Sequence, residues 1–169
     1  MPRNLPLGNG HMLIAFDHIN QIRDLYYPHV GQNNHALGHP FRMGVWVNGK
    51  FRWLDDGLWE RDLGYQPQTL VTDVRLLHPE LDVELHAVEA VDFHENLFLR
   101  RFKIKIPSGE ASQVRLFFHH DFYFEQNEVG DTAYYEPERR AVFHYKEKNW
   151  FMINGAVELQ QSPFEAEGN

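Results

Sequence analysis

The sequence predicts an all-β protein, built as an antiparallel β-sandwich. Apolar and polar residues alternate with a period of two in several short stretches, which is typical of strands with one face turned to water. Turn-forming residues recur between these stretches, and no long segment repeats its apolar residues every 3.6 positions. Many short strands joined by frequent turns therefore indicate a sandwich and leave no evident place for a helix.

Three regions carry the clearest strand patterns. In residues 101–106, Phe and Ile alternate with Arg and Lys, and in residues 81–87, Leu, Val and Ala alternate with Asp, Glu and His. Residues 43–47 and 51–53 flank the dipeptide Asn48-Gly49 with apolar side chains. Asn-Gly between two apolar runs is the strongest short signal for a β-hairpin, because both turn positions need a positive φ angle.

Further strands are expected in six other stretches, separated by turn chemistry such as that of Pro107-Ser108-Gly109. These stretches are residues 11–17, 21–27, 70–78, 132–135, 141–146 and 150–154. A strand is also expected over residues 116–124, where aromatic residues occur on both faces. Such a strand is either buried in the sandwich or covered by another domain.

Residues 1–156 are expected to form one β-sandwich domain, and residues 157–169 a polar tail or a truncated continuation. The segment from Pro28 to Pro40 is rich in Gly, Asn and His and cannot form a regular strand. We interpret it as a loop, and polar loops on rigid sheets often carry function.

The composition excludes several classes of protein. Hydrophobic residues make up 43% of the chain, which is enough for a packed core. The formal net charge of −8 and the lack of a basic cluster argue against a nucleic-acid partner. The absence of cysteine excludes disulfides, thiol catalysis and thiolate metal sites. No stretch is apolar enough for a membrane span and the first residues do not read as a signal peptide, so we expect a cytoplasmic protein with no membrane partner.

The histidines of two segments are candidate metal ligands, since neutral imidazole binds metal ions well. They are His29, His35 and His39 in the loop, and the adjacent His119 and His120, which are followed by the carboxylate of Asp121 as a further candidate ligand. Their spacing matches no compact metal motif, and adjacent residues of a strand point to opposite faces. We therefore expect hydrogen-bonded histidines, with no metal and no cofactor.

Two further patterns are interpreted as structural. The glycine-rich segment Leu7–His11 precedes a strand, whereas a phosphate cradle depends on a following helix N-terminus, so we expect a turn there. Carboxylates are plentiful, and a glycosidase needs two of them at a defined separation. The candidates are Asp55, Asp56, Glu60, Asp62, Asp92, Glu95, Glu125 and Asp131. The sequence pairs none of them, so each is expected to be a solvated surface residue and no catalytic residue is assigned.

Two neighbouring segments carry a resemblance to a known family. The first runs from Pro6 to Asp17, and the second runs from Ile22 to His35 and ends in Tyr-Tyr-Pro-His-Val-Gly-Gln-Asn-Asn-His, its most specific part. Together with residues 130–135 and 143–146, they resemble the first domain of prokaryotic glucoamylase, glucodextranase and trehalase-like enzymes of glycoside hydrolase family 15.

The resemblance implies an architecture and a partner. In that family an N-terminal β-sandwich, often called a supersandwich, precedes an (α/α)6 barrel that carries both catalytic glutamates and hydrolyses α-glucosidic bonds with inversion. This chain has no helical repeat, so no catalytic residue is transferred to it. Its expected partner is the C-terminal catalytic domain of the same parent protein. Because the chain is shorter than the family's usual first domain, some strands of the sandwich are expected to be missing.

The loop supports a more specific hypothesis. We expect the segment Tyr26–His39 to reach over the active-site mouth of the barrel, where it would touch substrate or order a catalytic loop. The hypothesis rests on the many hydrogen-bond donors, acceptors and aromatic rings that this segment carries at the end of a strand. The candidate substrate-proximal residues are Tyr26, Tyr27, His29, Gln32, Asn33 and His35.

Two alternative functions stay open. The chain would be a carbohydrate-binding module for α-glucans if its aromatic residues grip an α-glucan oligosaccharide, which is a second expected partner. It would be a free-standing metal-dependent β-barrel enzyme if it held a catalytic metal ion. For the parent enzyme, starch oligosaccharides, dextran and trehalose are all open as substrates.

Overall fold

The computed structural model describes residues 5–110, 113–127 and 129–158, and within these ranges the protein is built of antiparallel strands. The strands are β1 (Leu5–Gly8), β2 (Leu13–Phe16), β3 (Ile22–Tyr26), β4 (Arg42–Val47), β5 (Lys50–Trp53), β6 (Glu60–Tyr65), β7 (Thr72–His78), β8 (Val83–Val91), β9 (Phe98–Lys105), β10 (Val114–His119), β11 (Thr132–Glu136), β12 (Ala141–Lys146) and β13 (Asn149–Asn154). One short 3-10 helix, η1 (Phe124–Gln126), follows β10. The prediction of an all-β antiparallel fold is confirmed. No helix in the described ranges is long and apolar enough to cross a membrane.

The chain divides into two compact units. The N-terminal unit comprises Met1–Val129 and contains β1 to β10, and the C-terminal unit comprises Gly130–Asn169 and contains β11 to β13. One sandwich domain over residues 1–156 stays a prediction. Residues 159–169 of the expected polar tail lie outside the described residues.

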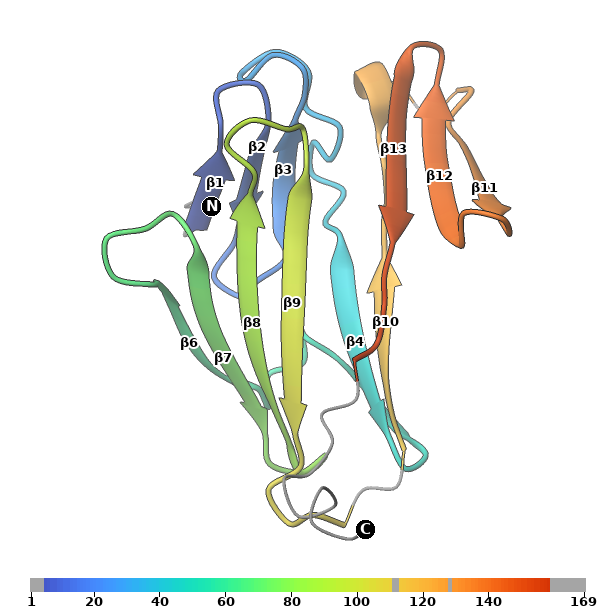
Figure 1. The fold of residues 1–169 in the computed structure, drawn as a ribbon. Coiled ribbons are helices and arrows are strands. Elements are labelled where there is room, and N and C mark those ends of the chain that lie inside the picture. The colour runs from blue at the N-terminus through green and yellow to red at the C-terminus, as the bar shows by residue number, and fades with distance from the viewer. Residues whose placement is uncertain (1–4, 111–112, 128, 159–169) are drawn as a thin grey trace, which may run out of the picture. The chain divides into compact units, whose positions relative to one another are not determined.

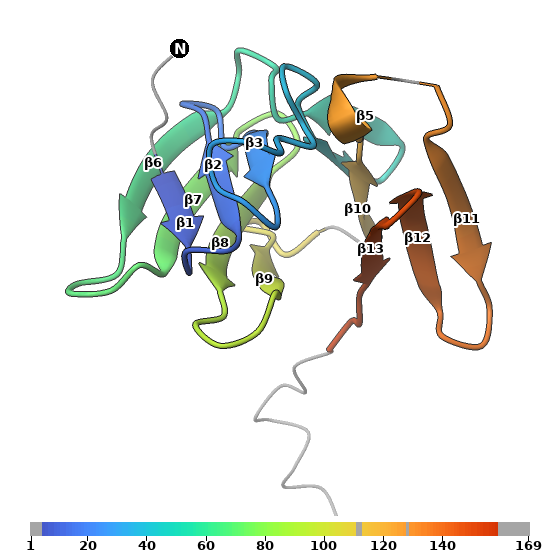
Figure 2. The same ribbon diagram turned by 90° about the horizontal axis from the view of Figure 1, so that it is seen from above.

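Three antiparallel sheets make up the N-terminal unit (Figure 1), with strand orders β1-β2-β3, β6-β7-β8-β9 and β10-β4-β5. Strand β1 contacts both β6 and β8, so the first sheet lies against the second, as the view from above shows (Figure 2). The rings of Phe16 on β2 and Phe98 on β9 have centroids 6.2 Å apart. Those of Phe102 on β9 and Phe118 on β10 are 5.6 Å apart. The second sheet therefore contacts both of the others.

The core of the N-terminal unit is formed by the inward faces of these sheets. Completely buried apolar side chains of this unit include Leu7, Ile14, Ala15, Phe16, Ala36, Val45, Val74, Leu76, Val83, Leu85, Ala87 and Phe124. Along β7 and most of β8, every second residue is buried, as the period-two pattern predicts. Burying one Leu, Ile or Phe side chain contributes about 1.5–3 kcal/mol, so these faces are the main source of stability in this unit.

The predicted hairpin at Asn48-Gly49 is confirmed. Val47 of β4 pairs with Lys50 of β5, and the two residues between them have φ angles of 45° and 93°. A two-residue turn with positive φ at both positions matches the right-handed twist of the strands that it joins.

The C-terminal unit is a three-stranded meander of order β11-β12-β13 (Figure 1). All three strands were predicted. One face carries ring pairs that stack across neighbouring strands. Tyr145 and Trp150 stack with centroids 4.3 Å apart, and Tyr134 and Phe143 stack at 5.3 Å. Aromatic pairs of this kind stabilise adjacent strands beyond the area that they bury.

The strand expected over residues 116–124 is shorter than predicted, because β10 ends at His119. Beyond it, Glu125 and Gln126 have φ angles of 54° and 57°, so the backbone turns through η1. The Tyr123 amide donates to the His35 carbonyl at 2.8 Å, so the backbone of this segment hydrogen-bonds to the loop. Its alternating aromatic residues resemble a strand pattern, but Tyr123 and Phe124 pack against His39 and His35 of the loop.

The sequence pattern missed β1 and β6. Strand β6 has the sequence Glu-Arg-Asp-Leu-Gly-Tyr and so lacks a clear apolar alternation, and β1 is only four residues long and contains Pro and Gly. Each is placed by pairing with a better-defined neighbour, β1 with β2 and β6 with β7. Pairing partners commonly override weak intrinsic strand propensity.

Candidate functional site

The loop that follows β3 is held by the side chain of Asn34, which is 3% exposed. Its Oδ1 accepts hydrogen bonds from the amides of Leu25, Ala36 and Leu37 at 3.1–3.2 Å. Its Nδ2 donates to Oδ1 of Asp24 at 2.7 Å. A short side chain that satisfies three amides in this way fixes the backbone on both sides of the loop.

His35 gives the loop a second internal support. It is 1% exposed, and its Nε2 donates to the carbonyl of Tyr27 at 2.7 Å. Its amide donates to the carbonyl of Leu25 at 2.7 Å. Its ring lies 5.2 Å from that of Phe124 in η1. Of the six predicted substrate-proximal residues, His35 therefore lies in the interior and joins the loop to the segment after β10.

The tip of the loop, His29–Asn33, is exposed throughout. The amide of Gln32 donates to the carbonyl of His29 at 3.1 Å, and that of Tyr27 donates to the carbonyl of Asn33 at 3.1 Å. These bonds close a compact turn in which Gly31 has a φ of 87°. Three predicted residues, His29, Gln32 and Asn33, thus have exposed side chains on a backbone that is already ordered.

The two tyrosines lie at the base of this tip and are half-buried. Tyr26 ends β3 and forms a bridge with Asn34. The hydroxyl of Tyr27 accepts a hydrogen bond from Nδ2 of Asn96 at 3.4 Å. Asn96 belongs to the turn between β8 and β9, so Tyr27 connects the loop to a second turn.

Three connections gather at one end of the N-terminal unit, namely the loop, the β1–β2 turn and the β8–β9 turn (Figure 1). Asn9 of the β1–β2 turn donates through Nδ2 to the carbonyls of Asp92 and Glu95 at 2.8 and 3.1 Å. Of the predicted turn over Leu7–His11, Leu7 and Gly8 end β1, and the turn begins at Asn9, with Gly10 at a φ of 96°. This end displays polar groups together with the ring of Phe93, which is 80% exposed. The segments Pro6–Asp17 and Ile22–His35 both contribute to it.

The carboxylate of Asp92 organises the β8–β9 turn. Its Oδ1 accepts the amides of His94 and Glu95, each at 2.8 Å. These two hydrogen bonds hold the pKa of Asp92 below its ordinary value, because they favour the ionised form. Asp92 is thus a turn-forming carboxylate.

Other candidate carboxylates form ion pairs with basic side chains. These pairs are Arg42–Asp55 at 2.8 Å, Arg52–Asp56 at 3.3 Å and Lys146–Asp131 at 3.1 Å. Paired in this way, the three carboxylates have local structural roles. Glycoside hydrolysis requires two carboxylates at a defined separation, and we assign that role to none of these three.

The candidate histidines have separate surroundings. Nδ1 of His39 lies 3.2 Å from Oδ2 of Asp121, and its ring stacks on Tyr123 at 4.7 Å. His119 is exposed on β10, whereas His120 packs against Phe41 with centroids 5.4 Å apart. Across residues 5–110, 113–127 and 129–158, no three or more His, Cys, Asp or Glu side chains are grouped so as to hold a metal ion.

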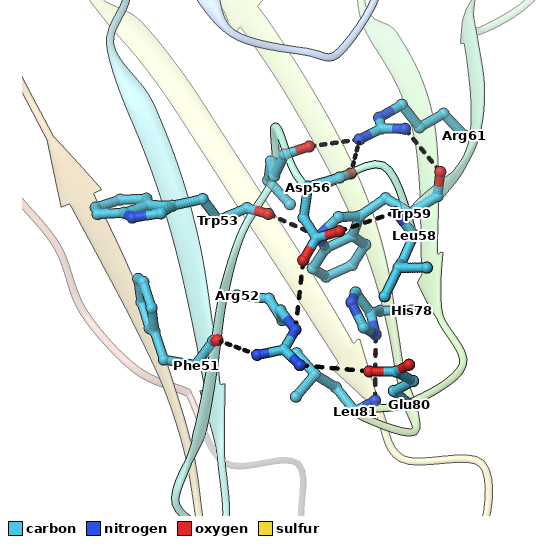
Figure 3. A network of polar contacts seen from close by, with 11 residues as sticks. Phe51, Arg52, Trp53, Asp56, Leu58, Trp59, Arg61, His78, Glu80 and Leu81 are labelled. Atoms are coloured by element: carbon cyan, nitrogen blue, oxygen red, sulfur yellow. Dashed lines mark hydrogen bonds and ion pairs between the residues drawn. The ribbon is translucent and has the colours of Figure 1, made fainter.

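Sequence reasoning missed a polar network behind β5, drawn in Figure 3. Arg52 forms ion pairs with Asp56 at 3.3 Å and with Glu80 at 3.3 Å. Arg61 on β6 donates to the carbonyls of Trp59 and Asp56 at 2.7 and 2.9 Å. This network fastens β5 and the chain after it to the second sheet.

The same network contains a completely buried histidine. The ring of His78 meets that of Trp59 edge-on at 4.9 Å, and its Nδ1 accepts the Leu81 amide at 3.2 Å. Burial lowers the pKa of His78, because charging the ring there would remove it from water. Trp59 donates through Nε1 to the carbonyl of Trp53 at 2.9 Å, which ties this pair to the end of β5 (Figure 3).

A buried ion pair inside the N-terminal unit was also missed. Glu89 on β8 is 1% exposed, and its Oε1 accepts Nε of Arg100 on β9 at 2.7 Å. The Arg100 guanidinium lies within 5.0–5.8 Å of the ring centroids of four phenylalanines. The signal was available, because Glu89 continues the inward-facing series Val83, Leu85 and Ala87 of β8.

Comparison with known proteins adds no family to these observations: protein-family models, curated proteins and solved structures all yield no match to this chain.

Proposed function

We propose that this chain is the non-catalytic N-terminal β-sandwich domain of a glucoamylase-like glycoside hydrolase. The observation that carries the proposal is the construction of the loop with the family-like run. Asn34 and His35 hold it from inside, while His29, Gln32 and Asn33 are exposed at its tip. A pre-ordered polar tip at one end of a rigid sandwich is suited to contact another domain or its substrate at a low entropic cost.

The proposed partner is an (α/α)6 catalytic domain of the same parent protein, which would supply both catalytic glutamates. The N-terminal unit would pack on this domain through the end where its three connections gather. The loop tip would then contact the substrate or a catalytic loop at the mouth of the barrel.

The first test is the coding sequence in frame beyond residue 169. A region with repeated amphipathic helices and two suitably placed glutamates would support the proposal. A different domain in that position would contradict it.

The second test uses the full-length parent enzyme and the double variant Gln32→Ala/Asn33→Ala. Loss of two positioned polar contacts is expected to lower kcat/KM by about tenfold or more, with Tm nearly unchanged. The matched control is Gln113→Ala, which removes an exposed amide just before β10. An unchanged kcat/KM in the double variant would show that the tip does not contact the reacting site.

The variant Asn34→Ala tests the internal support of the loop separately from the exposed residues at its tip. It leaves the buried amides of Leu25, Ala36 and Leu37 without their acceptor, so it is expected to lower Tm together with activity. A fall in activity without loss of stability would place Asn34 in the contact surface and not in the support.

A further inference from the structure

The outward face of the sheet β6-β7-β8-β9 carries an open hollow of about 190 Å³. It is lined by side chains from three adjacent strands (Figure 1), namely Arg75 on β7, Glu84 and His86 on β8, and Lys103 and Lys105 on β9. These residues alternate with more buried ones along each strand, so their side chains point away from the core. Sites for drug-sized ligands usually measure about 300–1,000 Å³, so the hollow suits a smaller ligand.

The strand register places two cations on either side of one imidazole. Arg75 pairs with His86, and His86 pairs with Lys103. Neighbouring strands are about 5 Å apart, so the backbones of Arg75 and Lys103 are separated by roughly 10 Å, and both long side chains can close on a group above His86. Nε2 of His86 lies 2.6 Å from Oδ1 of Asp73, which fixes the ring between them. The two cations repel each other, and an anion held between them would reverse this.

The protein neutralises these cations only in part. The Arg75 side chain is 63% exposed, and its Nε lies 4.0 Å from Oδ1 of Asp73, at the outer limit of an ion pair. Nζ of Lys105 lies 3.7 Å from Oε2 of Glu84, and 69% of the lysine side chain is exposed. Within the part of the chain that the structure describes, Lys103 forms no ion pair. The hollow therefore presents hydrated N–H donors with unused capacity.

This concentration of positive charge contrasts with the acidic chain that carries it. The sequence has 16 Lys and Arg residues against 24 Asp and Glu residues, and its net charge is −8. The hollow, in contrast, is lined by three cations and one carboxylate. The sequence shows no basic run here, because alternate residues of separate strands supply these groups. Strand pairing thus creates a local positive potential that attracts anions.

We propose that this hollow, through Arg75, Lys103 and Lys105 around His86, binds a single phosphate group, carried by inorganic phosphate or by a phosphate monoester. Such a group has a charge of about −1.5 to −2 at pH 7 and several strong acceptor oxygens. Donors that approach from β7 and from β9 match a tetrahedral set of oxygens better than a planar carboxylate. The site lies within the N-terminal unit and does not rest on the function proposed above.

A neighbouring acidic strand favours one phosphate over an extended polyanion. Asp62 on β6 pairs with Arg75, and Glu60 lies on the same face of that strand, with both carboxylates exposed. A nucleic-acid backbone laid across the strands would bring further phosphates toward these carboxylates, which would repel them. Nucleic-acid binders neutralise several phosphates together, whereas the hollow gathers donors at one point.

The test is calorimetric titration of the whole chain with inorganic phosphate and, separately, with glycerol 3-phosphate. Ionic strength is held constant, at about pH 7.5, where the phosphate group carries most of its second charge. Saturable binding of at least one compound is expected, and Lys103→Gln should weaken it by about fivefold or more. The matched control is Lys50→Gln, which removes an exposed lysine of β5, in a different sheet, and should leave binding unchanged. Tighter binding of glycerol 3-phosphate would identify the ligand as a monoester, and equal binding would identify the phosphate group alone.

Thermal unfolding gives a second readout, which separates binding from a structural role of Lys103. Without phosphate, the Tm of Lys103→Gln should equal or exceed that of the natural chain, because the substitution relieves repulsion with Arg75. Added phosphate should raise the Tm of the natural chain more than that of the variant. A lower Tm in Lys103→Gln with unchanged phosphate binding would make Lys103 structural and contradict the proposal.

Three further results would overturn the proposal. The first is the absence of saturable binding with both phosphate compounds. The second is binding that persists unchanged in the double variant Arg75→Gln/Lys103→Gln, or that Lys50→Gln weakens as much as Lys103→Gln does. The third is saturable binding of a single-stranded oligonucleotide without binding of either phosphate compound, which would assign this face to nucleic acid instead.

Discussion

The N-terminal and C-terminal units use their aromatic residues differently. In the N-terminal unit, Phe16 and Phe124 are completely buried within a core to which several sheets contribute. In the C-terminal unit, the rings stack on one another across a single sheet, and Trp150 and Tyr134 remain 51% and 42% exposed. Because a single meander has no second layer within its own unit, its rings pack against one another across neighbouring strands.

This difference indicates where stability resides. Inward faces from several sheets remove large apolar areas from water together, whereas stacked pairs on an exposed face add small and separate increments. Substitutions in the N-terminal unit should therefore have large cooperative effects, and those in the C-terminal unit should have small local ones.

The largest effect is expected for Glu89→Ala in the N-terminal unit. The change leaves Arg100 without its carboxylate among phenylalanine rings, and breaking a buried ion pair in this way costs about 3–5 kcal/mol. The free energy of unfolding, measured with urea, should fall by that amount. Glu84→Ala is the control on the outer face of the same strand, where an exposed pair with Lys105 contributes about 0–1 kcal/mol. Equal losses in the two variants would refute the role given to burial.

A smaller effect is expected for Trp150→Ala in the C-terminal unit. The change removes the ring that stacks on Tyr145, and such a pair contributes about 0.5–1.5 kcal/mol. The unfolding free energy should fall by no more than this. A loss as large as that of Glu89→Ala would mean that the C-terminal unit shares a core with other structure, and the comparison of the two units would fail.

The smallest effect is a dependence of stability on pH. Burial lowers the pKa of His78 in the folded chain below its ordinary value of 6.5. Its contribution to stability is therefore complete above pH 6.5 and is lost as the pH falls through the folded-state pKa. Protonation would also place a hydrogen on Nδ1, where the Leu81 amide donates.

The measurement is urea unfolding at about pH 7.5 and about pH 5, compared between the natural chain and His78→Gln. The variant should lose part of the pH dependence. His144→Gln is the companion variant in the C-terminal unit, because burial lowers the pKa of His144 as well. Identical pH dependence in His78→Gln and in the natural chain would exclude His78 as its source.

Much of the fold was predictable from local patterns. The alternation along β7 to β9 and the Asn48-Gly49 turn depend on neighbouring residues, so the sequence identifies them directly. Strand β6 was not predictable in this way, because it is polar and is placed by pairing with β7. The error over residues 120–124 has a similar origin, since Tyr123 and Phe124 pack on the loop and do not extend β10.

The position of the candidate site along the chain was predictable, but which of its residues are buried and which are exposed was not. Sequence reasoning selected the loop from its density of polar and aromatic groups and grouped His35 with Gln32 and Asn33. Tertiary structure separates them, because the His35 ring packs against Phe124, which lies about ninety positions away along the chain. A contact between residues so far apart in the sequence cannot be recognised from the local sequence pattern.

The sequence by itself determined the all-β class, most of the strands and the position of the polar loop, because periodicity and turn chemistry are local properties. Only the tertiary structure decided which loop residues are exposed, that Glu89 and Arg100 are paired in the interior, and that the rings of Phe51 and Trp53 lie close to Gly44. Each of these depends on strand register and on contacts between distant segments, and such contacts are fixed only when the sheets pack.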